Sequence, residues 1–288
     1  MTELYSSIDE REFALFSDYI AEKSGIFIRP EKAYLIETRL SKLMTDVGAE
    51  SFSKFYDYIV SNPHSGISQK IINAITVNET TWFRDTAVWT ILMDEVIPAF
   101  VKELLSGKKQ KIRIWSAASS TGEEAYSLAM CIDDYLGKNN IKGVGLPDFE
   151  IIATDISERV LDIARKGRYD RVSMSRGMND YYKNKYFENT GSAWNLVPEI
   201  LEAVKFEQFN LINSFAGLGK FDLILCRYVL IYFPDELKKR IIQKLHDSLK
   251  DNGVLFTGTY VLYDLFKDGF EMVNFENITY YTRKQVDR

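Results

Sequence analysis

The stretch SAASSTGEEAYSLAM, from Ser116 to Met130, begins as an apolar strand, ends as an apolar helix and carries two adjacent glutamates in between. Turns that hold phosphate are glycine-rich and usually carry Lys or Arg. This turn has one glycine, Gly122, followed by Glu123 and Glu124 at the start of the helix. Because two carboxylates repel a phosphate, the turn favours a ligand with positive charge and hydroxyl groups.

A third carboxylate, Asp155, ends the strand-like run FEIIATDI. In dinucleotide-binding folds, an acidic residue at this strand end accepts hydrogen bonds from ribose hydroxyls. The phosphate fingerprint G-x-G-x-x-G is missing from the chain. A carboxylate placed to bind ribose, in a chain that lacks a phosphate-binding loop, predicts a nucleoside ligand without pyrophosphate. S-adenosylmethionine, with its sulfonium cation, is such a ligand. In the alternative interpretation, Glu124 and Asp155 only cap or begin helices.

The composition argues against several other classes of protein. The formal net charge is −5 and the isoelectric point is near 5.3, whereas a nucleic-acid binder normally has a strongly basic face. No apolar run approaches the roughly 20 residues of a membrane span, and the N-terminus does not resemble a signal peptide.

His64 and His246 have no partner at metal-ligand spacing, so we expect no metal site, and a Ser-His-Asp site has no support. Cys131 and Cys226 lie in apolar stretches and are expected to be reduced core residues of a cytoplasmic protein.

The elements that must position these residues show two different patterns of apolar residues. In the first part of the chain, apolar residues recur at helical spacing, as in SIDEREFALFSDYIAEKSG and PEKAYLIETRLSKLMTDVG. The predicted helices cover residues 7–25, 30–48, 51–60, 67–75 and 86–107. From Lys111 onward, strand-like runs alternate with helices, which indicates a doubly wound parallel sheet with its ligand site at the carboxyl ends of the strands.

The alternation of strands and helices is interrupted between Arg168 and Phe206, where the chain is rich in tyrosine. We expect a short helical piece there, followed by a small antiparallel β excursion with a turn near Thr190 and Gly191. The run ENITYYTRK at the end of the chain predicts a final strand, antiparallel to the strand in GVLFTGTY.

Five blocks of this sequence, in this order, resemble the bacterial chemotaxis receptor glutamate methyltransferases. The match spans about Glu10 to Phe256, nearly the whole chain. The blocks are NETTWFRD, IWSAASSTGEEAYSLAM, IIATDISERVLDIARKGRYDR, FEQFNLI and FDLILCRYVLIYF. The resemblance implies methyl transfer from S-adenosylmethionine to glutamate side chains on the cytoplasmic helices of chemoreceptors, with S-adenosylhomocysteine as product.

The resemblance also implies the domain organisation. A helical N-terminal domain would cover residues 1–85, and a linking helix residues 86–110. A Rossmann-like methyltransferase domain would cover residues 111–288, with a small antiparallel β-subdomain inserted at about 168–207.

Ten site residues follow from the matching motifs. Arg84 and Tyr232 would act on the reacting groups, with Arg84 pairing with a carboxylate of either the cofactor or the acceptor. A glutamate is already ionised at pH 7, so no general base is required. The residues implied in cofactor binding are Asn78, Thr80, Arg84, Glu124, Asp155, Asn210, Leu211, Arg227 and Tyr228. The alternatives are an interdomain ion pair for Arg84 and a buried strand-end ring for Tyr232.

The chain departs from the family pattern in two places. Tyr228 stands where the family usually has Asn, and Thr259, Tyr260 and Val261 stand where it commonly has His-Ser-Glu. These changes leave open an adaptor that binds S-adenosylmethionine without turnover in a chemosensory pathway. A methyltransferase for RNA or a small molecule is a third reading, opposed by the acidic charge and the full-length match.

Two features bear on how the receptor would be recognised. Family members that grip a receptor's C-terminal pentapeptide have a longer, glycine-richer loop in the β-subdomain than FENTGSAWNLVPEI, so we expect no pentapeptide binding. Lys32, Arg39 and Lys42 lie close to one face of a predicted helix and could meet acidic receptor helices. The alternative is an ordinary solvated face.

Overall fold

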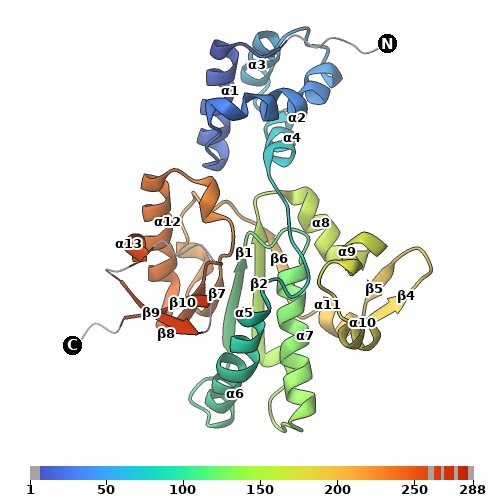
Figure 1. Ribbon diagram of the computed structural model, residues 1–288, viewed down its shortest axis with the longest axis vertical. Coiled ribbons are helices and arrows are strands. Elements are labelled where there is room, and N and C mark those ends of the chain that lie inside the picture. Colours follow the sequence, from blue (N-terminus) through green and yellow to red (C-terminus); the bar gives the residue numbers. More distant parts are fainter. Residues whose placement is uncertain (1–6, 259–262, 267–268, 276–277, 285–288) are drawn as a thin grey trace.

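The computed structural model describes residues 7–258, 263–266, 269–275 and 278–284. A helical N-terminal region stands on a C-terminal α/β region, with a small separate sheet at one side (Figure 1). This is the predicted fold class: an all-helical front, a Rossmann-like domain and an inserted antiparallel β-subdomain. No helix in the described ranges is both long and apolar enough to cross a membrane. The departure at Thr259, Tyr260 and Val261 lies outside the described residues.

The N-terminal helices pack around a core of their own. Phe16, Ile36 and Phe55 are fully buried in it. The first helix begins in a capping box, in which the backbone N–H groups of Asp9 and Glu12 each donate to the other residue's carboxylate. The elements are α1 (Glu10–Ser24), η1 (Pro30–Lys32), α2 (Ala33–Asp46), α3 (Phe52–Ser61) and α4 (Ile67–Ile75).

The predicted linking helix is one rod with an irregular middle. It consists of α5 (Thr86–Ile91), a π-helical turn η2 (Leu92–Val96) and α6 (Ile97–Leu105). Pro98 follows this turn and has no backbone N–H to donate to the carbonyl four residues earlier. The wider turn adapts the rod to this missing hydrogen bond.

A seven-stranded sheet in the described part of the chain organises the α/β region, in the order β6-β2-β1-β7-β8-β10-β9. The first five strands of this order are parallel, and β10 is antiparallel to both β8 and β9. The strands are β1 (Ile112–Ala117), β2 (Phe149–Asp155), β6 (Val204–Gln208), β7 (Phe221–Leu225), β8 (Leu249–Phe256), β9 (Phe270–Phe275) and β10 (Ile278–Arg283). The strand order reverses between β1 and β7, where doubly wound sheets open a ligand crevice at their carboxyl ends.

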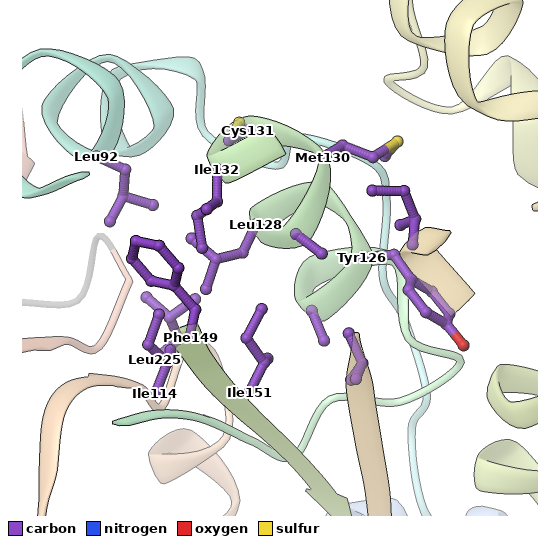
Figure 2. Close-up of a cluster of buried hydrophobic side chains, with 14 of the residues drawn as sticks. Leu92, Ile114, Tyr126, Leu128, Met130, Cys131, Ile132, Phe149, Ile151 and Leu225 are labelled. Atoms are coloured by element: carbon purple, nitrogen blue, oxygen red, sulfur yellow. The ribbon is translucent and has the colours of Figure 1, made fainter. Parts of the chain in front are cut away.

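Helices cover both faces of this sheet and bury its apolar strands. Figure 2 shows Leu128 and Ile132 of α7 packed with Ile114 and Ile151 from the strands. The helices and short turns are α7 (Glu123–Lys138), η3 (Leu146–Asp148), α8 (Glu158–Lys166), η4 (Ala216–Leu218), η5 (Leu230–Tyr232), α12 (Asp235–Ser248) and α13 (Tyr263–Phe266).

The predicted β excursion is a three-stranded antiparallel sheet in the order β3-β5-β4. Two helices come between β3 and β4 in the sequence, and a third follows β5. It lies beside α7 and α8 (Figure 1). Its elements are β3 (Arg168–Tyr169), α9 (Arg171–Ser175), α10 (Asp180–Tyr186), β4 (Phe187–Asn189), β5 (Trp194–Leu196) and α11 (Pro198–Leu201). The predicted β excursion ran to about residue 207, whereas β6 pairs in parallel with β2 at the edge of the main sheet. The sequence analysis assigned no strand to β9, which is the other edge strand and has exposed residues.

Candidate active site

A cavity of about 500 Å³ lies between the helical region and the carboxyl ends of the parallel strands. This is within the size range of small-molecule sites. All ten predicted site residues line it: Asn78, Thr80, Arg84, Glu124, Asp155, Asn210, Leu211, Arg227, Tyr228 and Tyr232. The fold therefore brings together side chains that are up to 154 positions apart in the sequence, from Asn78 to Tyr232.

The turn after β1 forms the floor of the cavity in a strained conformation. Ala118 and Ser120 have φ values of 60° and 52°, which side chains other than glycine adopt rarely. Gly122 caps α7 with φ 93°, and a Cβ atom there would lie 3.0 Å from the Cβ of Ala164. Such strain persists where surrounding contacts fix the backbone. Here the N–H of Ser120 donates to Asp155 Oδ2 at 3.0 Å and its hydroxyl donates to the carbonyl of Asn78 at 2.9 Å.

Asp155 is the buried carboxylate at the end of β2, with 6% of its surface exposed. Its oxygens accept hydrogen bonds from the backbone N–H groups of Ser120 and Ser157. Burial raises the pKa of Asp155, and these backbone hydrogen bonds only partly offset the effect. Each oxygen keeps a further lone pair, so the carboxylate can accept from two hydroxyl groups of a ligand.

Glu124 and Arg227 form a buried ion pair that joins α7 to the end of β7. Arg227 Nη1 donates to Glu124 Oε2 at 2.8 Å, and the hydroxyl of Ser116 donates to Oε1 at 2.8 Å. Arg227 Nη2 donates to Asp85 Oδ2 and to the carbonyl of Arg84, each at 2.6 Å. The Arg227 side chain is only 2% exposed, so two carboxylates balance one buried cation. The sequence analysis missed Asp85, although it directly follows Arg84 in NETTWFRD.

Arg84 and Tyr228 stack at one side of the cavity. The guanidinium carbon lies 3.7 Å from the centroid of the Tyr228 ring, and Nη1 donates to the carbonyl of Glu79. Among the described residues, no carboxylate lies within ion-pair distance of Arg84, so the alternative of an interdomain ion pair is not realised. Tyr228 has φ 57°, a conformation that suits Asn better than Tyr, and its hydroxyl donates to Asp85.

Tyr232 also lines the cavity, in η5. Its carbonyl accepts from the N–H of Phe27, which joins this turn to the helical region. Partial burial raises the pKa of the Tyr232 phenol, and the charge of Arg84 opposes this increase. The hydroxyl is therefore protonated near neutral pH and can donate to a carboxylate.

Asn210 links the two regions through its side-chain amide. Nδ2 donates to the carbonyl of Lys23 at 2.8 Å, and Oδ1 accepts from the N–H of Ile212. One N–H and one lone pair of this amide, together with the backbone of Asn210, remain for the predicted contact with the cofactor. Leu211 beside it is a buried apolar part of the cavity wall.

The helical region supplies a basic wall. Lys32 and Arg39 line the cavity, whereas Lys42 is exposed and does not. Arg39 is half-buried, and its Nη1 donates to the carbonyl of Ile75 at 2.7 Å, near the end of α4. Two of the three basic residues on the predicted docking face thus belong to the cavity.

These residues fit S-adenosylmethionine by their chemistry. Asp155 suits the ribose hydroxyls, and Glu124 gives the nearby wall a negative charge that suits a sulfonium or amino group. The Ser119 hydroxyl is buried in the cavity wall and has no hydrogen-bond partner among the residues described, so it is available to a ligand.

The comparisons with known proteins agree with this chemistry. The family model described as CheR methyltransferase, SAM binding domain, matches residues 78–278, and the one described as CheR methyltransferase, all-alpha domain, matches residues 11–76. A chemotaxis protein methyltransferase of Pseudomonas putida is 36% identical over 263 residues, which is 91% of this chain and 94% of the relative. Chemotaxis protein methyltransferase 1 of Pseudomonas aeruginosa is 38% identical with the same coverage. A chemotaxis protein methyltransferase of Vibrio parahaemolyticus is 37% identical, over 93% of this chain and 94% of the relative.

Proposed function

This chain belongs to the CheR methyltransferase family, and from that premise we propose that its acceptors are glutamate side chains on the cytoplasmic helices of chemoreceptors. The chain is a chemotaxis protein methyltransferase that uses S-adenosylmethionine. The observation that carries the proposed acceptor is the charge of the cavity, which is acidic at Asp155 and Glu124 and basic at Lys32, Arg39 and Arg84. A cationic methyl donor and an anionic acceptor suit these two sides.

The first task of the site is to hold the cofactor, which supplies a methyl group on a sulfonium sulfur when bound. We assign the ribose hydroxyls to Asp155, and the amino or sulfonium side to Glu124. The Glu124 carboxylate is held in place by Ser116 and Arg227, so it needs no rearrangement when the ligand arrives.

The second task is to orient the acceptor carboxylate. A glutamate is ionised at neutral pH, so no residue has to remove a proton, and catalysis rests on alignment and on exclusion of water. Arg84 and Tyr232 both line the cavity, so an acceptor carboxylate bound there can meet both side chains. We propose that the Arg84 guanidinium pairs with the acceptor carboxylate and that the Tyr232 hydroxyl donates to it.

The rim of the cavity suits an amphipathic helix that carries the glutamate. Phe27, Val77 and Ile231 line the cavity and are 52%, 47% and 45% exposed. Large apolar side chains exposed together are typical of an interaction site. With Lys32 and Arg39 they would offer apolar and basic contacts to the two faces of such a helix.

Base-labile methyl transfer tests the proposed acceptor. The full chain would be incubated with labelled S-adenosylmethionine and chemoreceptor cytoplasmic fragments from the same organism, with Asp155→Ala as the control. We expect volatile methanol on alkali treatment with the native chain and none with the variant. Cofactor binding without label on any receptor would reject this acceptor and favour the adaptor. If RNA is added and carries the label instead, the hypothesis of an RNA methyltransferase is favoured.

We further propose that methylation does not depend on a C-terminal receptor pentapeptide. The β4–β5 connection is tight, with the N–H of Thr190 donating to the carbonyl of Ala193 at 2.9 Å, and this supports the proposal. Receptor fragments with and without their last five residues should be methylated at equal rates. A clear loss of rate on truncation would contradict it.

A further inference from the structure

The inserted β-subdomain contacts the part of the chain that lines one wall of the cavity. We name residues 78–84 the linker segment and residues 168–201, from β3 to α11, the insert. We propose that the insert holds the linker segment in its cofactor-binding position, with Trp82, Arg176 and Gly177 as positioning residues. This rests on the proposed assignment of Asn78 and Thr80 to the cofactor.

The closest contact joins Gly177 to the backbone of the linker segment. A Cβ atom on Gly177 would lie 2.0 Å from the carbonyl oxygen of Trp82, which no side chain could tolerate without a backbone shift. Gly177 also has φ 87°, in the left-handed region. The N–H of Trp82 donates to the carbonyl of Arg176 at 3.1 Å. The two backbones are therefore in direct contact at this point.

Aromatic packing fixes the same contact from the other side. The Trp82 ring is fully buried, and its centroid lies 4.8 Å from that of Tyr169 and 5.4 Å from that of Phe187, both in edge-to-face geometry. The neighbouring ring of Phe83 lies 4.5 Å from that of Tyr182, which is also in the insert. Such pairs add specific geometry to the apolar burial.

An ion pair completes the contact near the cavity. Arg176 Nη2 donates to Glu79 Oε1, and both side chains are partly exposed. Glu79 lies between Asn78 and Thr80, which line the cavity together with it. The linker segment is thus held by the insert at Glu79, Trp82 and Phe83.

Both ends of the linker segment are hydrogen-bonded to the α/β region. Asn78 accepts from Ser120 in the turn after β1, and Arg84 accepts from the buried Arg227. A backbone shift at Trp82 would therefore move side chains only two positions away that line the cavity. Displacements of about 1 Å at such positions cost up to about a hundredfold in enzyme function. By linkage, cofactor binding should stabilise the insert in turn.

A pair of glycine substitutions tests the contact. Gly177→Ala and Gly191→Ala both place a side chain at a similar left-handed φ, 87° and 84°, and both glycines are exposed residues of the insert. Only Gly177 has a neighbour that the new Cβ would strike, because Gly191 has nothing within 4 Å. We expect S-adenosylhomocysteine, measured by calorimetry, to bind about tenfold or more weakly to Gly177→Ala and within about twofold to Gly191→Ala. Equal affinities of the two variants would overturn the proposal.

A milder pair covers the case in which Gly177→Ala does not fold. Arg176→Gln removes the ion pair to Glu79, and Arg171→Gln changes an exposed arginine on the neighbouring helix α9. We expect roughly threefold weaker binding for Arg176→Gln at an unchanged melting temperature, and no change for Arg171→Gln. A melting-temperature loss with unchanged affinity would show that Arg176 is only structural and would overturn its positioning role.

Hydrogen exchange provides the reciprocal readout. S-adenosylhomocysteine should slow exchange of amides at residues 168–190 in the native chain, and less so in Arg176→Gln. Absence of any protection there, with the ligand bound, would contradict the coupling. These measurements need no receptor, so their failure is distinguishable from a failure of the proposed acceptor.

Discussion

The two walls of the cavity differ in how far their charged side chains are buried and hydrogen-bonded. On the α/β wall, defined by Glu124, Asp155 and Arg227, every charged group is mostly buried and hydrogen-bonded. On the helical wall, defined by Lys32 and Arg39, the cations are exposed or half-buried. Buried charges need fixed partners, and such a wall is rigid before the ligand arrives. Exposed charges stay hydrated, so the helical wall can adapt to a macromolecular acceptor at little energetic cost.

The largest expected difference between the walls is in folding stability. Arg227→Met leaves Glu124 and Asp85 without their shared cation and should lower the free energy of unfolding by about 3–5 kcal/mol. Arg39→Met removes hydrogen bonds of a half-buried group and should cost about 1 kcal/mol. Urea denaturation of both variants measures the comparison. Equal losses would remove the proposed distinction between the walls.

Cofactor affinity should depend on the α/β wall. Asp155→Ala removes a charged acceptor for two hydroxyl groups and should weaken S-adenosylhomocysteine binding by about a hundredfold or more. Arg39→Met serves as the comparison and should leave this affinity within about twofold. Calorimetry on the folded variants gives both values. A similar loss in the two variants would assign the cofactor to both walls.

The pH dependence of cofactor binding should report on the same carboxylate. Burial raises the pKa of Asp155 in the ligand-free protein, and the ribose hydroxyls favour its ionised form. Affinity should therefore be full above this raised pKa and fall by about tenfold per pH unit below it. The fall should begin at a higher pH than an ordinary aspartate would give. Asp155→Asn should bind weakly with a flat profile, and a retained slope would implicate another group.

Arg84 lies between the walls, and its substitution decides to which function it belongs. If it pairs with the acceptor as proposed, Arg84→Gln should raise the KM for the receptor by about ten- to a hundredfold. S-adenosylhomocysteine affinity should then change by less than about twofold. The opposite pattern would assign the guanidinium to the carboxylate of the cofactor tail.

The smallest effects should come from the exposed cations. Lys32→Gln should raise the KM for the receptor about two- to threefold, and Lys42→Gln, outside the cavity, should do so less. Because exposed charges are screened, the effect of Lys32→Gln should shrink at 0.5 M salt. Steady-state methylation at two salt concentrations checks this. A larger effect from Lys42 would move the docking face away from the cavity.

The sequence supported much of the fold and the membership of the site. Helical spacing predicted the four N-terminal helices, and the alternation of strands and helices predicted the sheet. Edge strands β6 and β9 were not identified as strands of this sheet, because half-exposed strands have no continuous apolar run. The family blocks named ten residues that share one cavity, although their individual roles stay predictions.

The partners of those residues were not predictable. Asp85 and Ser116 lie inside family blocks, but nothing in the sequence shows that Asp85, Ser116 and Lys23 hydrogen-bond to Arg227, Glu124 and Asn210. The contacts of Asp85 and Lys23 join residues more than 140 positions apart, and the contact of Ser116 depends on the turn that brings α7 back against β1. Which lone pair or N–H is still free for a ligand depends on such contacts.

By itself, the sequence determined the chemical inventory of this protein: carboxylates at the ends of two strands, no phosphate cradle, and an ordered set of family motifs. Motif order follows the chain, so it is readable without coordinates. The tertiary structure alone decided that Asp155 and the Glu124–Arg227 ion pair are buried on one wall while Lys32 and Arg39 lie on the other, and that the insert contacts the linker segment at Gly177 and Trp82. Both depend on how separately folded units pack, because burial and contact are properties of neighbours in space.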